Sequence, residues 1–139
     1  MIESSDVRLV VRQKWQFNSV TDAQPSTIEQ DMIMWVRHPR VEFQTRIDWH
    51  EHHHLLKVAH AVAVRATTAT HEIQFGHTTR PTHANTTWDV ARFETCAHRY
   101  VDLSEHDYGV AMMNDCKYGH DIFGNIIRMT CLKSPESPD

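Results

Sequence analysis

Apolar and polar residues alternate with a period of two along most of this chain, and no other feature constrains its fold as strongly. Successive side chains of a β-strand point to opposite faces of a sheet, so the alternation predicts strands with one covered face. It is most regular at residues 41–50, where Val41, Phe43, Ile47 and Trp49 are expected to point inward. Other strands are expected at residues 7–17, 28–36, 55–64, 69–75, 93–103 and 126–132.

Turn-forming residues separate these segments. We expect turns at residues 21–26, 38–40 and 117–121 and at Gly124-Asn125. No segment has the period of an amphipathic helix, so the strands have no crossover helices and should pair antiparallel. The pattern predicts an all-β antiparallel sandwich. Residues 1–133 are expected to form this β-sandwich portion, and residues 134–139 a polar linker or tail.

The composition is that of an ordinary globular chain. The 139 residues are 40% hydrophobic and 23% charged, enough for one core. A net charge of -4 with scattered Lys and Arg argues against a nucleic-acid-binding face. No apolar run is long enough to cross a bilayer, and the start lacks the pattern of a secretory signal. We therefore expect no nucleic-acid or membrane partner and a cytoplasmic location.

Three cysteines, Cys96, Cys116 and Cys131, lie far apart, and no two have Cys-x-x-Cys spacing. The pattern favours three reduced thiols in a cytosolic protein. One disulfide with one free thiol is the alternative.

Histidines are unusually frequent, with twelve in the chain and five between His50 and His60. In a strand, His50, His52 and His54 would share one face, where two or three imidazoles could hold zinc. The spacing is not that of a helical His-Glu-x-x-His site. The closed tetrahedral set that zinc prefers is not visible locally, so the pattern favours a polar strand end without metal.

Carboxylates offer a second candidate chemistry. Glycoside hydrolysis uses two of them across the scissile bond. Asp115 and Asp121 are expected in one turn, and Asp89 and Glu94 in the polar loop at residues 80–94. That loop is long and rich in hydrogen-bonding groups, which suggests a working surface. No spacing identifies a catalytic pair, and Asp115 and Asp121 can equally shape the turn through bonds to its backbone.

Three segments, taken together, resemble the C-terminal region of the glycoside hydrolase family 38 α-mannosidases, most closely the bacterial, fungal and animal cytosolic-type branch. The resemblance covers residues 41–135. Its motifs are Asp48-Trp49-His50-Glu51-His52-His53-His54, then Arg80-Pro81-Thr82-His83 with Asn85-Thr86-Thr87-Trp88-Asp89, and then Asn114-Asp115-Cys116-Lys117-Tyr118-Gly119-His120-Asp121. Three motifs in order are more specific than one.

The resemblance implies a large, multi-domain, zinc-dependent, retaining enzyme that removes terminal non-reducing α-D-mannose from oligosaccharides. Its nucleophile and zinc ligands would lie in an N-terminal α/β barrel and a helical bundle, and no segment of this chain resembles either. The chain is therefore expected to be non-catalytic, with no cofactor of its own. It would form an incomplete β-sandwich of the galactose mutarotase supersandwich type, with the missing domains as partners.

The resemblance further implies that sandwich loops close one wall of the mannose pocket. Carboxylates accept hydrogen bonds from sugar hydroxyls, amides and ammonium groups donate them, and aromatic rings offer a face. The candidate substrate-binding residues are Asn114, Asp115, Lys117, Tyr118 and Asp121 in the turn, Trp88 and Asp89 in the loop, and His50 and His53.

Departures from the family pattern are confined to strand ends. His60 and Ala61 replace an aromatic residue and a proline, and His54 replaces a basic residue. Two other functions stay open: a stand-alone carbohydrate-binding module and a structural, His-rich metal-binding β domain. A cut sandwich would also expose strand edges, so we expect self-association through strand pairing.

Overall fold

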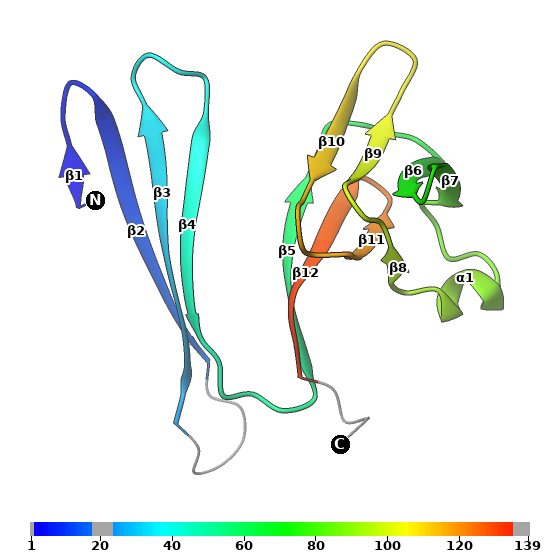
Figure 1. Ribbon diagram of the computed structural model, residues 1–139, viewed down its shortest axis with the longest axis horizontal. Helices are drawn as coiled ribbons and strands as arrows, with labels where there is room; N and C mark the ends of the chain where they lie inside the picture. Colours follow the sequence, from blue (N-terminus) through cyan, green and yellow to red (C-terminus); the bar gives the residue numbers. More distant parts are fainter. Residues whose placement is uncertain (1, 18–23, 135–139) are drawn as a thin grey trace. The chain divides into compact units, whose positions relative to one another are not determined.

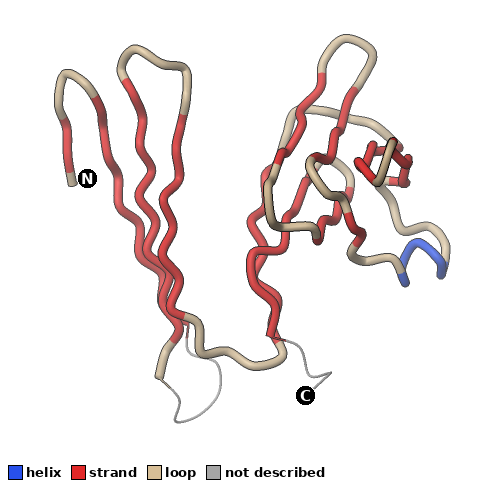
Figure 2. Tube along the Cα trace, viewed as in Figure 1, coloured by secondary structure: helices blue, strands red, loops and turns tan. Residues whose placement is uncertain are grey.

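The computed structural model describes residues 2–17 and 24–134. Its described part is almost entirely antiparallel β-sheet, with one short helix (Figures 1 and 2). The chain divides into two compact units, Met1–His52 and His53–Asp139, and each is described by itself. The expectation of an all-β antiparallel fold is confirmed.

The first unit holds one sheet in the order β1-β2-β3-β4. The long β3 lies centrally and pairs with β2 and β4 along almost its whole length. The predicted strands at residues 7–17, 28–36 and 41–50 are therefore confirmed with small changes at their ends. The bounds are β1 (Glu3–Ser4), β2 (Arg8–Phe17), β3 (Ser26–Trp35) and β4 (Val41–Asp48).

The register divides this sheet into an apolar face and a charged face. Trp15 lies opposite Ile28, and Met32 lies opposite Phe43, so these side chains share one face. The charged face holds ion pairs of Arg12 with Asp31, of Arg8 with Glu3, and of Glu29 with Arg12, Lys14 and Arg46.

The prediction that Val41 and Phe43 point into a core is wrong in one respect. They do share the apolar face, but Val41 is 48% exposed and Phe43 52% exposed. The alternation correctly gave the face that each side chain occupies. The alternation does not predict whether a second layer covers that face, and the four strands of this unit form a single sheet.

The second unit is a sandwich of two four-stranded sheets, in the orders β10-β9-β6-β7 and β5-β12-β11-β8. Its buried core comes from both sheets: Ala69, Val101 and Leu103 from one and Ile127 from the other. The bounds are β5 (His54–Ala61), β6 (Thr68–Ile73), β7 (Gly76–Pro81), α1 (Thr87–Ala91), β8 (Thr95–Cys96), β9 (Tyr100–Ser104), β10 (Gly109–Met113), β11 (Gly119–Phe123) and β12 (Ile126–Ser134).

Four details of the second unit differ from expectation. Residues 93–103 form two strands, β8 and β9, in different sheets. Residues 76–81 form β7, and the polar loop contains the one-turn helix α1. Residues 117–121 are not a turn, because β11 begins at Gly119. Short polar strands such as β7 lack the apolar alternation that makes a strand visible in sequence.

The remaining expectations concern the turns and the tail. The turn at Gly124-Asn125 joins β11 to β12, and Gly124 has a φ of 59°, which suits glycine. Phe75, between β6 and β7, has a φ of 58° although it is not glycine. Residues 21–23 of the expected turn at 21–26 lie outside the described residues, as do residues 135–139 of the expected tail, while Ser134 belongs to β12.

Candidate functional site

The connection between β10 and β11 is a turn of defined shape at residues 114–118. Its start is fixed by the Asn114 N–H, which donates to the Arg99 carbonyl at 2.9 Å. Within it, the Lys117 N–H donates to Asn114 Oδ1 at 3.0 Å. Its end is fixed by the Tyr118 carbonyl, which accepts from the Ala97 N–H at 2.9 Å. These bonds occupy backbone groups and one amide oxygen, and they leave other side chains available.

Four residues of this turn are exposed: Asp115, Cys116, Lys117 and Tyr118. The Tyr118 ring, 49% exposed, rests edge-on against the His98 ring at 5.7 Å between centroids. A side-chain hydrogen bond to Asp115, with burial and the charge of Asp115, raises the pKa of the Cys116 thiol, and the charge of Lys117 opposes this in part. The turn therefore presents an acceptor, a cation and a ring with a hydroxyl to solvent.

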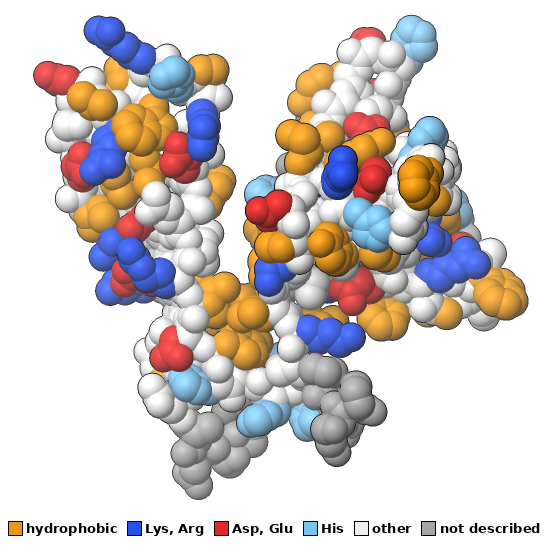
Figure 3. Space-filling view, viewed as in Figure 1, with side chains coloured by type: hydrophobic (Ala, Val, Ile, Leu, Met, Phe, Trp, Pro, Cys, Tyr) orange, Lys and Arg blue, Asp and Glu red, His pale blue; other side chains and the backbone are white. Residues whose placement is uncertain are grey.

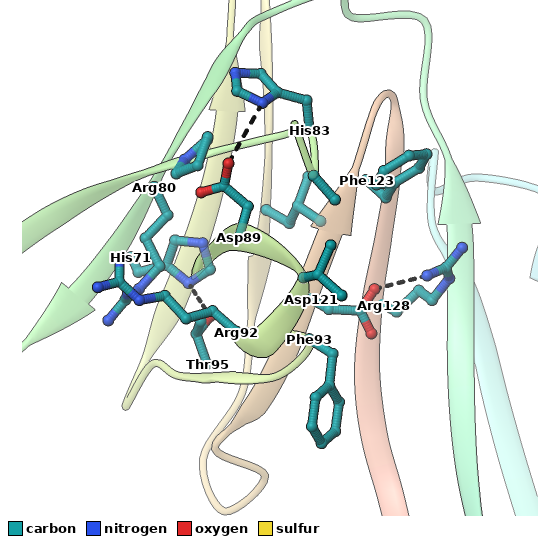
Figure 4. Close-up of a pocket in the computed structure, with 14 residues that line it drawn as sticks. His71, Arg80, His83, Asp89, Arg92, Phe93, Thr95, Asp121, Phe123 and Arg128 are labelled. Atoms are coloured by element: carbon teal, nitrogen blue, oxygen red, sulfur yellow. Dashed lines mark hydrogen bonds and ion pairs between the residues drawn. The ribbon is translucent and has the colours of Figure 1, made fainter. Parts of the chain in front are cut away.

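A pocket of about 300 Å³ lies in the second unit (Figure 4). Its lining comes from β6, β7, α1, β8, β11, β12 and the connections on either side of α1, and it includes His71, Arg80, Asp89, Arg92 and Asp121. Two predicted site residues, Asp89 and Asp121, are brought together here. The sequence analysis missed the three pocket arginines, although Arg80 stands inside a quoted family motif.

Asp121 is held by cations rather than open to solvent. One carboxylate oxygen lies 2.6 Å from Lys57 Nζ and the other lies 2.7 Å from Arg128 Nη1. Lys57 also lies 3.6 Å from Glu94. The expectation that Asp121 shares a turn with Asp115 is wrong, because Asp121 lies within strand β11.

Asp89 is also engaged within the fold. It forms a capping box with Thr86: the Asp89 N–H donates to Thr86 Oγ1, and the Thr86 N–H donates to the Asp89 carboxylate, each at 3.1 Å. Its carboxylate lies 4.0 Å from His83 Nδ1. The neighbouring Trp88 is exposed on the same helix.

A buried hydrogen-bond chain runs behind the pocket. The His120 Nδ1–H donates to the Tyr118 carbonyl at 3.1 Å, and the Thr95 hydroxyl donates to the His120 carbonyl at 3.2 Å. Because the single hydroxyl hydrogen of Thr95 is thus used, its oxygen accepts from His71 Nδ1–H at 3.3 Å. Burial, with the charges of Arg80 and His120, lowers the pKa of His71 to about 4. Burial also lowers the pKa of His120, so both rings are neutral at pH 7.

The two candidate histidines lie in different units. The His50 backbone N–H donates to Ser26 Oγ at 2.8 Å, and its ring lies 3.0 Å from Asp48. His53 opens the second unit with a φ of 59°. Among residues 2–17 and 24–134, no group of three or more His, Cys, Asp or Glu side chains is arranged to hold a metal. Within that part of the chain, the residues do not form the zinc centre that the resemblance implies for the other domains.

The surface and the cysteines carry few further signals. Cationic and anionic side chains are interspersed on the face seen in Figure 3. Cys96, Cys116 and Cys131 are free thiols. Within the part of the chain that the structure describes, no helix is long and apolar enough to span a membrane.

Comparison with known proteins identifies the family. The chain is 51% identical over 114 residues to human α-mannosidase 2C1, and this covers 82% of the chain and 11% of the relative. It is 44% identical over 139 residues to α-mannosidase G of Dictyostelium discoideum, covering 100% of the chain and 13% of the relative. The chain thus spans only about a tenth of each relative's length. A family model described as the glycosyl hydrolases family 38 C-terminal domain matches residues 1–139, and the chain belongs to that family.

Proposed function

We propose that this chain is a non-catalytic part of a retaining exo-α-mannosidase, and that its turn at residues 114–118 forms one wall of the pocket for terminal α-D-mannose. The observation that carries the proposal is the shape of that turn. Its backbone is fixed by bonds to Arg99, Asn114 and Ala97, while Asp115, Lys117 and Tyr118 remain exposed. A rigid backbone with available polar side chains costs little ordering when a sugar binds.

Each exposed group has a role in this proposal. Asp115 accepts hydrogen bonds from sugar hydroxyls, Lys117 donates to them, and the Tyr118 ring lies against a sugar face. The Asn114 side-chain amide nitrogen is buried and has no partner within the described residues, so it can donate to a sugar oxygen that reaches it. Trp88, on α1, adds a second exposed ring.

The other four candidate residues contribute less to sugar binding in this proposal: Asp89, Asp121, His50 and His53. Asp121 is neutralised by Lys57 and Arg128, and Asp89 caps α1, so both support the fold around the sugar site rather than carry it. His50 and His53 stay candidates for the rim.

The chemistry of bond cleavage is assigned to domains outside this chain. The family's aspartate nucleophile and its metal centre, zinc in this proposal, belong to the barrel and helical domains. No position of this chain resembles either of them. Support comes from the relatives, which are named α-mannosidases and of which the matched region makes up 11% and 13% of the length.

The test has two arms. The 139-residue chain is assayed for hydrolysis of an aryl α-mannoside and titrated calorimetrically with methyl α-mannoside. We expect no turnover and at most weak binding. In a longer chain that carries this domain with the rest of the enzyme, Asp115→Asn should raise KM or lower kcat/KM by about tenfold, the loss of one charge-assisted hydrogen bond. Asp107→Asn, at an exposed position in the β9–β10 connection, is the matched control.

Three outcomes contradict parts of the proposal. Turnover by the 139-residue chain would place the nucleophile within it. Tight binding of methyl α-mannoside by this chain would favour a stand-alone carbohydrate-binding module. An unchanged kcat/KM in Asp115→Asn would remove the turn from the sugar pocket.

We propose two further properties of the chain itself. The three free thiols and the likeness to the cytosolic-type branch support a cytoplasmic location. The exposed apolar face of the first sheet, with Trp15, Val41 and Phe43, supports self-association of the isolated chain. Light scattering at high concentration tests this, and a monodisperse monomer would contradict it.

A further inference from the structure

Two guanidinium groups in the pocket of the second unit have no anionic partner within the described part of the chain. Arg80 is the penultimate residue of β7 and Arg92 follows α1, and both line the cavity. Among residues 2–17 and 24–134, neither guanidinium forms an ion pair or a side-chain hydrogen bond, and Arg80 Nε is buried without a partner. A buried cationic donor without a partner is costly, so this arrangement calls for an anion.

The acidic residues of the pocket do not supply that anion. Asp121 already bonds to Lys57 and Arg128. Asp89 is occupied by the helix cap and lies beside His83. In Figure 4 the side chains of Arg80 and Arg92 lie on the His71 side of the pocket, apart from the Asp121–Arg128 pair. The cavity therefore has a region of uncompensated positive charge.

The lining also contains apolar and aromatic side chains. Phe93 and Phe123 are 69% and 55% exposed, and Ile122 and Val90 line the same cavity. Exposed rings beside a polar recess are suited to the apolar face of a sugar. At about 300 Å³ the cavity matches the smallest ligand pockets, which take a single monosaccharide-sized molecule.

We propose that this pocket binds a phosphorylated monosaccharide, with the phosphate between Arg80 and Arg92 and the sugar ring against Phe93 and Phe123. Arginine forks bind phosphate oxygens in pairs, and a phosphate has enough oxygens to accept from both guanidinium groups at once. His71 adds a neutral imidazole beside them. The site is separate from the turn at residues 114–118 and does not rest on the proposed mannoside function.

The experiment is calorimetric titration of the 139-residue chain at low ionic strength with three probes: inorganic phosphate, mannose 6-phosphate and mannose. We expect mannose 6-phosphate to bind tightest, phosphate to bind more weakly, and mannose not to bind at this pocket. Arg92→Gln should weaken both phosphate-containing probes by about tenfold, since it removes one charge-assisted contact. Arg80→Gln should do the same.

Controls separate the pocket from general charge. Arg99→Gln changes an exposed arginine outside the pocket and should leave both affinities unchanged. Phe93→Ala should weaken the binding of mannose 6-phosphate and leave the affinity for phosphate unchanged, so that the two affinities become more alike. Circular dichroism confirms folding, and Arg92, beyond the short helix, gives a variant with little burial to disturb.

Several results would overturn the proposal. A titration with sodium chloride at equal ionic strength is the reference. If phosphate and mannose 6-phosphate give no more binding heat than chloride, the pocket is not an anion site. Equal affinities for the two would exclude the sugar part. If Arg99→Gln lowers the affinity as much as Arg92→Gln does, general surface charge and not the pocket attracts the ligand.

Discussion

Lys57 and Asp121 form an ion pair of 2.6 Å that spans strand β12, because β5 and β11 flank that strand in the sheet. Arg128, from β12 itself, takes the other carboxylate oxygen at 2.7 Å. One carboxylate thus joins three neighbouring strands. All three side chains are mostly covered, so this cluster is screened less by water than a surface pair.

Removing the charge of Asp121 should destabilise the second unit. Asp121→Asn keeps the shape but leaves Lys57 and Arg128 without their shared anion. We expect a loss of about 2 kcal/mol in the free energy of unfolding. Urea denaturation measures it, with Asp107→Asn as an exposed control that should change little. If both variants unfold at the same urea concentration, the cluster contributes no net stability.

Burial of His71 should make stability depend on pH. Its pKa is 6.5 in the unfolded chain and about 4 in the folded one, because burial penalises the charged ring. Below pH 6.5 the unfolded chain takes up a proton that the folded chain does not, so stability falls between pH 6.5 and pH 4. The full contribution is present above pH 6.5, and the loss is about 3 kcal/mol.

Urea midpoints between pH 7.5 and pH 4 measure this dependence. His71→Gln should flatten the slope, although it also lowers stability at neutral pH, and His77→Gln at an exposed position should not. His120, whose pKa burial also lowers, adds slope of the same sign in every variant. An unchanged slope in His71→Gln would show that this ring is not neutral in the fold.

The turn between β11 and β12 should require glycine. Gly124 has a φ of 59°, and its surroundings leave open space for a methyl group, so only the backbone opposes alanine. Gly124→Ala should cost about 1 kcal/mol. Gly76→Ala is a matched control, because Gly76 has equal space and no positive φ. Equal effects in thermal unfolding would contradict this explanation.

At Phe75, replacement by glycine should stabilise the fold, because a large residue occupies a left-handed conformation there. Its side chain is 111% exposed and has no packing to lose. Phe75→Gly removes a strain of about 1 kcal/mol and adds a smaller entropic cost in the unfolded chain, for a net gain near ~0.5 kcal/mol. Phe75→Ala keeps the Cβ atom and should give no gain. A loss of stability in the glycine variant would show that the ring has a stabilising contact.

The fold could be predicted because the strands carry their pattern locally. β2, β3 and β4 were visible through alternation alone, and Gly124-Asn125 through its turn chemistry. β7 was missed because its sequence is polar. Residues 93–103 were read as one strand because alternation continues across the break at Ala97-His98-Arg99, where the chain changes sheets.

The candidate site was harder to predict because it depends on which strands meet. Asp89 and Asp121 share a pocket only through the packing of α1 near β11. Asp121 was assigned to a turn because Gly119 resembles a turn residue, yet Gly119 starts a strand in which it pairs with Cys96. The unpaired state of Arg80 and Arg92 depends on distances across the fold, which no local pattern contains.

The contact between Asp115 and Cys116 gives the proposed sugar-binding turn its own chemical reporter. The Asp115 carboxylate raises the pKa of the Cys116 thiol. The fraction of reactive thiolate is therefore small, and alkylation of Cys116 is slow. A sugar hydroxyl that donates to Asp115 competes for that carboxylate and speeds the reaction. Cys96 is also exposed, and its rate of alkylation serves as the internal reference in the same sample. Occupancy of the turn can therefore be followed by the ratio of two modified peptides in a mass spectrum, without any engineered label.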